Sequence, residues 1–259
     1  GIDGSVGASR LALAQGATAR QGERHASAGA TSFETGGVTI TGTESTTQLA
    51  ILAPQLRVLS VSATQERQSA MLEELTWRMG QMTLKSGADG QALSVDVVEL
   101  ALRGLQAMAD GQELAIAALT VDNPSVSFSQ TPKGLQLQAK EPVLLLTDVR
   151  AHRGEENAKL ATLRLAAGSV QLSNQDTATA LSLAALVANG TTLALQRAGE
   201  GLDLSALALG SDTLRLSLDN AGMRVAVGTT SASVQGVLAR QGEHDVALKE
   251  GRLQVAEVQ

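Results

Sequence analysis

Short runs in which apolar and polar residues alternate follow one another along the chain, most clearly from Gly168 onward. In the segment Ser211–Thr230, three leucines alternate with polar residues before Asp219–Gly222, and three apolar residues alternate with others after it. Successive side chains of a strand point to opposite faces, and Asp219–Gly222 is rich in turn-forming residues. This segment is therefore predicted to be a β-hairpin with one apolar face, and the chain to be all-β.

Hairpins of this kind recur from Gly168 to the end of the chain. The units begin at Gly168, Gly190, Gly210 and Gly236, which are 22, 20 and 26 residues apart. This pattern predicts a long antiparallel meander of repeated hairpins, and the irregular spacing argues against a strict solenoid. The sextets Ala19–Arg24 and Ala239–His244 are similar, and we interpret them as two convergent polar turns and not as a true repeat.

Two stretches are also compatible with helix. Ala63–Met82 contains helix-forming residues, but period-two spacing from Leu75 to Met79, with a bulge at Gly80, favours a strand. A short helix before Leu75 remains an alternative. Leu93–Asp110 begins with strand-like alternation and ends in residues that could form one helical turn. At most one or two short helices are therefore expected.

The 259 residues are enough to bury a large core and are divided into three segments. Residues 1–92 form an amino-terminal β segment with a possible short helix, residues 93–159 a segment of strands with prolines, and residues 160–259 the hairpin meander. Three prolines, Pro124, Pro132 and Pro142, are expected at sheet edges or in loops. We predict that all three segments belong to one curved, open, taco-like sheet, a β-groove.

Composition excludes several classes of function. Apolar residues make up 43% of the chain, but there are only two Phe, one Trp and no Tyr, so the apolar surface must be aliphatic. The net charge of −6 is spread out and no block of Lys or Arg occurs, so nucleic acid is not an expected partner. The absence of Cys excludes disulfides, thiolate catalysis and cysteine-ligated metals, and is compatible with the periplasm.

The sequence contains no apolar run long enough to span a membrane as a helix, and it begins without Met. It is therefore expected to be a mature chain or a piece of a longer protein.

Residues suited to catalysis are scarce. His25, His152 and His244 are expected in polar loops, at spacings that bring no two onto one face of a helix or strand. No nucleophile elbow, P-loop, dinucleotide-binding glycine motif or EF-hand loop is present. The chain is accordingly predicted not to be an enzyme and to need no metal or other cofactor.

The alternating positions of the carboxy-terminal half define one apolar face, which is the candidate binding site. Its residues are Leu163, Leu165, Val170, Leu172, Leu193, Leu195, Leu202, Leu204, Leu214, Leu216, Leu218, Met223, Val225, Val227, Val246 and Leu248. Alternation shows that one face avoids water without showing what covers it. An ordinary sandwich core and an open groove are both compatible with it.

In an open groove, lipid acyl chains would cover the apolar face. Burying a methylene group contributes ~0.8 kcal/mol, so covering a chain of about fifteen carbons contributes roughly 12 kcal/mol before ordering costs.

The segment Leu93–Phe128 carries a resemblance to a known family. An apolar strand is followed by the turn Ala109–Gln112 and by a second strand containing Thr120–Val126, which reads Thr-Val-Asp-Asn-Pro-Ser-Val. This arrangement resembles the recurring segment of AsmA-like proteins, including the branch with the domain of unknown function 748. The meander from Leu160 onward is similar to the repetitive β region of that family.

The resemblance implies a repeating β-groove with a hydrophobic channel, anchored in the inner membrane of Gram-negative bacteria and involved in moving phospholipid to the outer membrane. The amino-terminal transmembrane helix usual in the family is not present in this sequence, and members are much longer, so the chain would be a segment of the conduit. The expected partners are phospholipid acyl chains, both membranes through flanking segments, and a further chain that could pair with a sheet edge. The alternative is a structural or adhesive surface β-repeat domain with a sealed aliphatic core.

Overall fold

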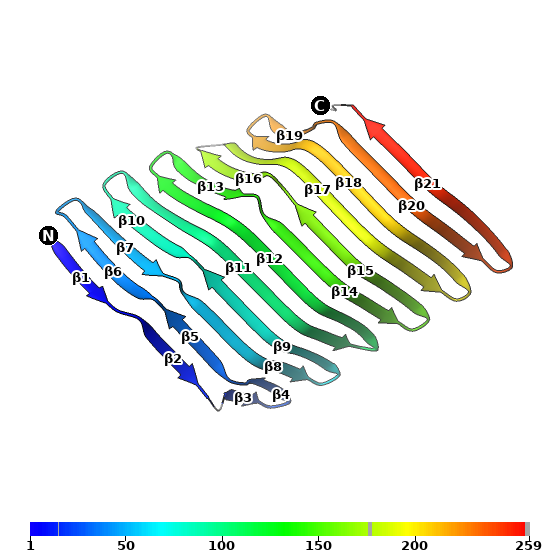
Figure 1. Cartoon of the computed structure of the whole chain (residues 1–259), viewed down its shortest axis with the longest axis horizontal. Coiled ribbons are helices and arrows are strands. Elements are labelled where there is room, and N and C mark those ends of the chain that lie inside the picture. Colours follow the sequence, from blue (N-terminus) through cyan, green and yellow to red (C-terminus); the bar gives the residue numbers. More distant parts are fainter. Residues whose placement is uncertain (15, 176–177, 257–259) are drawn as a thin grey trace.

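The chain folds into one large antiparallel β-sheet. The computed structural model describes residues 1–14, 16–175 and 178–256, and within them it contains 21 strands and no helix. Each length of chain that crosses the sheet pairs with the length before it and the length after it in sequence, so the topology is a simple meander (Figure 1). The sheet is open, and its two edges are the amino-terminal strands and the last strand. The predicted all-β, open antiparallel sheet is therefore confirmed.

The strands form twelve rows, six descending from the upper to the lower turns of Figure 1 and six ascending. The descending rows are β1 (Ile2–Val6), β2 (Ser9–Leu13) and β3 (Ala17–Gln21); β7 (Thr46–Leu52) and β8 (Gln55–Gln65); β11 (Gly90–Ala109); β13 (Gly134–Lys140) and β14 (Val143–Arg153); β17 (Ala178–Arg197); and β19 (Gly222–Val227) and β20 (Thr230–Gln241). The ascending rows are β4 (Arg24–Ala28), β5 (Thr31–Thr35) and β6 (Gly37–Gly42); β9 (Gln68–Met79) and β10 (Gln81–Gly87); β12 (Gln112–Thr131); β15 (Glu156–Ala166) and β16 (Ser169–Gln175); β18 (Glu200–Asp219); and β21 (His244–Val255).

The rows repeat with a constant period of 44 residues. The first residue of every lower turn has a positive φ angle, and these residues are Gly22, Glu66, Asp110, Gly154, Ala198 and Gly242, each 44 positions after the one before. Two-residue hairpin turns of the twist-compatible types require such left-handed residues. One descending row, one lower turn, one ascending row and one upper turn therefore make one repeat.

Two lines of residues that fall outside the regular strand pairing cross the sheet, and we call them the first and second crease. At each of them the pairing register continues on both sides and is interrupted at the crease itself. Single backbone hydrogen bonds still join opposed residues of the first crease, such as Glu141 N–H to the Gly168 carbonyl at 2.9 Å. The first crease runs through Gly36, Ala53, Gly80, Val97, Pro124, Glu141, Gly168, Ala185 and Asp212. The second crease runs through Ser60, Glu73, Gly104, Ala117, Asp148, Ala161, Thr192, Ser205, Gly236 and Lys249.

Left-handed backbone conformations produce the creases. The φ angle is positive at Ala53, Val97, Glu141 and Ala185 in the first crease, and at Ser60, Gly104, Asp148, Thr192 and Gly236 in the second. In each crease, successive residues with positive φ are again 44 residues apart. The reason is that they all belong to descending rows, and each repeat contains one descending row. Together with the lower turns, these positions include every non-glycine residue with positive φ in the described part of the chain.

A crease changes which residues face a given side. In β11, Leu93 and Val95 share a face with their apolar partners in β10, whereas Leu100 and Leu102 share a face with Trp77 and Leu75 of β9. The apolar positions are thus two residues apart within a facet and three apart across a crease. This three-residue step keeps all apolar side chains on one side of a sheet that bends twice.

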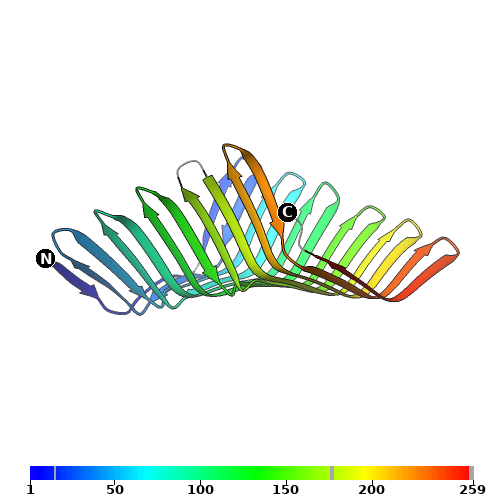
Figure 2. The same cartoon turned by 90° about the horizontal axis from the view of Figure 1, so that it is seen from above.

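The sheet is bent into a trough. Figure 2 shows that both ends of the strands turn toward the same side, away from the viewer of Figure 1. Twelve rows spaced by the usual inter-strand distance make the trough about 50 Å long. We call its concave side the inner face and its convex side the outer face.

Several sequence-based interpretations are corrected by this fold. Ala63–Met82 contains the end of β8, a lower turn, β9 and the start of β10 and no helix, so the strand that we favoured there is confirmed. Leu93–Ala109 lies in β11, so the helical turn near Met108 is wrong. The period is constant, and the four glycines at which we began the hairpin units lie at different places within the repeat. The sextets Ala19–Arg24 and Ala239–His244 occupy the same place in the first and sixth repeats, so they are equivalent elements and not convergent turns.

The prolines follow the repeat as well. Pro132 lies in an upper turn and Pro142 between β13 and β14, as expected for loops. Pro124, in contrast, lies inside the long strand β12. It belongs to the first crease and lies outside the regular strand pairing on both sides. At the equivalent positions Gly36, Gly80 and Gly168 the backbone N–H donates to a carbonyl of the following row, and this donor is missing at Pro124.

Candidate functional site: the inner face of the trough

The inner face is apolar along the whole length of the trough. At equivalent positions of successive repeats the same class of residue recurs, for example Ile40, Leu84, Phe128, Leu172 and Leu216. The central facet continues this lining, with Phe33, Trp77, Val121, Leu165, Leu209 and Leu253 at another set of equivalent positions. Between the residues that flank the turns, no described inner position carries Asp, Glu, Lys or Arg.

The pairing register places all the predicted site residues on this inner face. Leu214 pairs with Val227, Leu216 with Val225 and Leu218 with Met223, and directly opposed residues project to the same side of a sheet. The other predicted residues join them through equivalent pairs: Leu172 with Leu181, Leu193 with Leu204, Leu195 with Leu202, and Leu248 with Val237. Leu163, Leu165, Val170 and Val246 complete the set.

Sequence reasoning missed the first half of the lining. Residues such as Trp77, Leu100, Leu102, Leu144 and Leu146 face inward in the same way as the predicted set. The signal for them was the three-residue step between two short period-two runs, repeated every 44 residues. Uninterrupted period-two alternation, from which the carboxy-terminal residues are predicted, does not include this step.

No second layer covers the lining in the described part of the structure. The buried apolar residues are Ala50, Val95, Ala139 and Ala167, and no large side chain is fully buried. Every residue of the predicted set is half-buried or exposed; Leu216 and Val225, for example, keep 38% and 42% of their surface accessible. An apolar strip of this extent is unfavourable in water unless something covers it.

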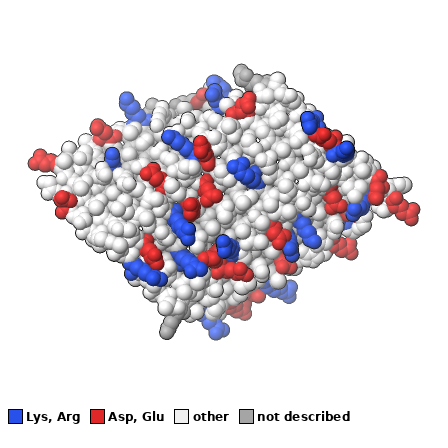
Figure 3. All heavy atoms as spheres, viewed as in Figure 1, with Lys and Arg blue, Asp and Glu red and all other residues white. Residues whose placement is uncertain are grey.

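The outer face is polar and carries most of the charge. Figure 3 shows Lys, Arg, Asp and Glu scattered over the convex side, without a large patch of one sign. Several of these residues form exposed ion pairs across neighbouring rows, such as Arg57–Glu74 at 2.7 Å and Arg10–Glu34 at 3.0 Å. At the second crease, hydrogen bonds from Arg150 to the Asp148 carboxylate, at 2.8 and 3.0 Å, raise the pKa of Arg150. The charge pattern gives this face an ordinary solvated character.

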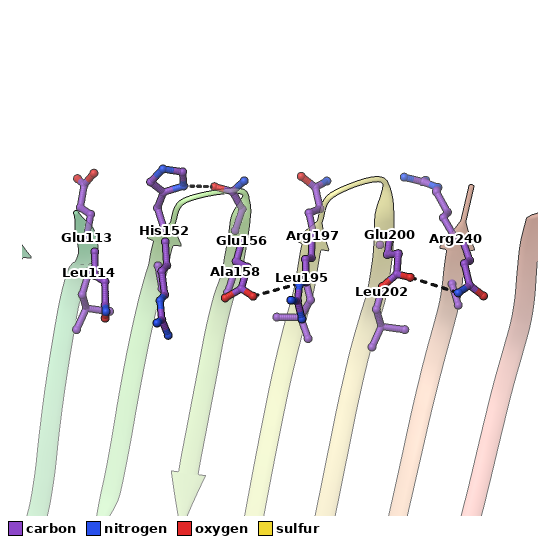
Figure 4. A pocket seen from close by; sticks show the side chains of 18 of the residues that line it. Glu113, Leu114, His152, Glu156, Ala158, Leu195, Arg197, Glu200, Leu202 and Arg240 are labelled. Atoms are coloured by element: carbon purple, nitrogen blue, oxygen red, sulfur yellow. Dashed lines mark hydrogen bonds and ion pairs between the residues drawn. The ribbon is translucent and has the colours of Figure 1, made fainter. Parts of the chain in front are cut away.

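One large hollow lies on the inner face beside the lower turns. Its volume is about 950 Å³, and it extends from β11 to β21. Its floor is made by the last apolar inner positions before the turns, Leu114, Ala158, Leu195, Leu202, Ala239 and Val246. Figure 4 shows that Glu156 and Arg197 lie beside Ala158 and Leu195, where their side chains form an ion pair with an Nε–Oε1 distance of 3.3 Å.

The three histidines lie in strands next to lower turns and not in loops. Nδ1 of His152 is 2.7 Å from Oδ1 of Asn157, and the strands place His25 and His244 on other rows of the sheet. Among the described residues, no three His, Asp or Glu side chains are grouped so that they could hold a metal ion. None of the described segments forms a helix that is long and apolar enough to cross a membrane.

Comparisons with known proteins give no independent assignment. No protein-family model, no curated protein sequence and no solved structure matches this chain. The resemblance to AsmA-like proteins therefore stays a prediction from the residues, and the geometry of the inner face is the basis for a functional proposal.

Proposed function

We propose that the trough shields lipid acyl chains from water and that the chain is a non-enzymatic segment of a periplasmic AsmA-like protein that carries phospholipid between the inner and outer membranes. The main observation that supports this proposal is the uncharged, half-exposed aliphatic lining that runs through all six repeats. Acyl chains match this surface because both are apolar, and binding removes both from water.

The geometry of the lining suits transport more than storage. Most sets of equivalent inner positions hold Leu, Val, Ile, Ala or Phe, so an acyl chain meets a largely apolar surface in every repeat. One set beside the first crease is polar in three repeats, with Thr35, Asn123 and Ser211. Few of these side chains are aromatic, and the described inner face offers no charged group between its rims. A lipid tail can therefore move along the trough without losing a specific partner.

The alternative is a structural or adhesive surface β-repeat domain, and the constant 44-residue period favours it. In that class the apolar face is sealed by a second layer or by another copy, and function lies in the exposed turns. The two proposals differ in whether the lining is accessible to lipid.

The first test is organic extraction of the purified protein, followed by lipid mass spectrometry beside a matched soluble protein from the same cells. We expect stoichiometric phospholipid, enriched over the control protein. A folded, monomeric protein that contains no lipid would contradict the proposal and favour the structural repeat.

Single charges on the lining provide the second test. L216D and V225D place a carboxylate at paired, partly exposed inner positions, and each is expected to lower bound lipid about tenfold, because covering a charge with an acyl chain is costly. S217D is the matched control, since Ser217 lies on the same strand and faces outward with Arg224. Circular dichroism checks folding; if L216D and V225D both unfold the chain, these positions belong to a closed core and the groove proposal is wrong.

A further inference from the structure

We propose that the inner rim beside the lower turns binds the headgroup of a zwitterionic phospholipid, such as one with phosphate and ammonium groups. We call this rim the lower lip and define it by Arg153, Glu156, Arg197 and Glu200. The inference rests on the proposed function, because the lip would act on the headgroup of a lipid whose tails lie in the trough.

The lower lip continues the apolar floor without a gap. Arg153 and Glu156 pair across one lower turn, and Arg197 and Glu200 pair across the next. Two residues further from each turn, the same strands place Ala151 with Ala158 and Leu195 with Leu202 in the floor of the 950 Å³ hollow. A lipid whose tails cover this floor has its polar end at the lip.

The charges of the lip alternate from strand to strand. Arg153, Glu156, Arg197 and Glu200 stand on four consecutive rows, roughly 5 Å apart, so the two cations and two anions interleave. Arg197 pairs with Glu156 at 3.3 Å, and Oε1 of Glu200 accepts a hydrogen bond from Nε2 of Gln241 at 3.2 Å. Because the set has no net charge, it complements a headgroup that carries one charge of each sign.

The same groups are accessible to a ligand. The Arg197 and Glu156 side chains keep 72% and 49% of their surface exposed, so exchanging their mutual contact for a headgroup requires no opening of the fold. An arginine binds phosphate oxygens through its planar fork of donors, and a carboxylate accepts hydrogen bonds from an ammonium group. An anionic headgroup would bind the arginines but would be repelled by the negative charges of Glu156 and Glu200.

The opposite rim lacks these charges. The inner positions that flank the upper turns are Gly42, Thr47, Ser86, Gln91, Gln130, Leu135, Asn174, Thr179, Leu218 and Met223, all of them uncharged. A phospholipid therefore has one preferred rim for its headgroup, and its orientation across the trough is defined.

In the test, the protein is incubated with vesicles that contain equal amounts of phosphatidylethanolamine and phosphatidylglycerol. Protein is separated from the vesicles, and the lipids that remain bound are measured by mass spectrometry. We expect phosphatidylethanolamine to be enriched in the wild type, and E156Q/E200Q to lower the ratio of phosphatidylethanolamine to phosphatidylglycerol about fivefold with little loss of total lipid. R153Q/R197Q should lower the amounts of both lipids, because both contain phosphate.

E74Q/E99Q is the matched control, because it removes two carboxylates from the outer face and should leave the ratio unchanged. Equal uptake of both lipids by the wild type, or an unchanged ratio in E156Q/E200Q, would overturn the headgroup inference while leaving the acyl-chain groove intact. Absence of both lipids from every folded variant would overturn the proposed function together with this inference.

Discussion

Val97 illustrates how single residues bend the sheet. Its φ angle is +52°, a left-handed conformation that β-branched residues adopt with strain, and it lies in the first crease with 45% of its surface exposed. Ala53, Glu141 and Ala185 take the same conformation at equivalent positions. The bend is therefore imposed by pairing on both sides of the crease and not by a residue type that prefers it.

Replacing Val97 by Asn is expected to stabilise the protein. Asn tolerates the left-handed conformation better, and little apolar surface is lost, so the free energy of unfolding should rise by about 1 kcal/mol. Urea denaturation measures the change. V98N is the control and should lower stability, because Val98 faces inward with a half-buried side chain; equal effects of the two substitutions would show that Val97 is not strained.

At the scale of the element, the facet between two creases is the unit that determines which way side chains point. Within a facet the side chains alternate with period two, and each crease adds one further outward residue. In β11 this extra residue at the first crease is next to Asp96, and in β12 the corresponding place is taken by Pro124. The length of each strand segment is therefore constrained more tightly than the identity of its residues.

Deleting Asp96 tests this constraint. The deletion shifts one facet of β11 by one residue and moves Leu93 and Val95 to the outer face, so stability should fall by about 3 kcal/mol or folding should fail. Insertion of two glycines between Pro132 and Lys133, in an upper turn, should change stability little, because a turn can absorb added residues. Chemical denaturation measures the free energy of unfolding of both variants. A deletion that leaves this free energy unchanged would contradict the constraint on the length of the facet.

At the scale of the whole molecule, the trough is a stack of six similar repeats. In the described part of the chain, each row pairs with the rows next to it and with no others, so stability is the sum of local interfaces and not the property of one central core. The same arrangement leaves the lining open, because a single layer has no opposing layer to cover it. Stability and accessibility of the inner face therefore have the same structural origin.

Removing one whole repeat should leave this architecture intact. Deleting residues 112–155 removes 44 residues and joins β11 to β15 across an equivalent lower turn, so a cooperative thermal transition and a β-type circular dichroism spectrum should persist. Deleting residues 112–133 removes half a repeat and joins the lower end of β11 to the start of β13, which lies at the upper rim. That variant should not fold; if both deletions behave alike, the repeat is not the folding unit.

The alternating residues alone determined that the chain is all-β, antiparallel and apolar on one face, because side-chain direction in a strand depends only on local backbone geometry. They also placed Leu214, Leu216 and Val225 on that face. The tertiary structure decided where the sheet bends, that the period is 44 residues, and that the apolar face of the first half joins that of the second. These features depend on pairing between rows, which holds residues such as Val97 and Asp148 in a conformation that their own side chains do not favour.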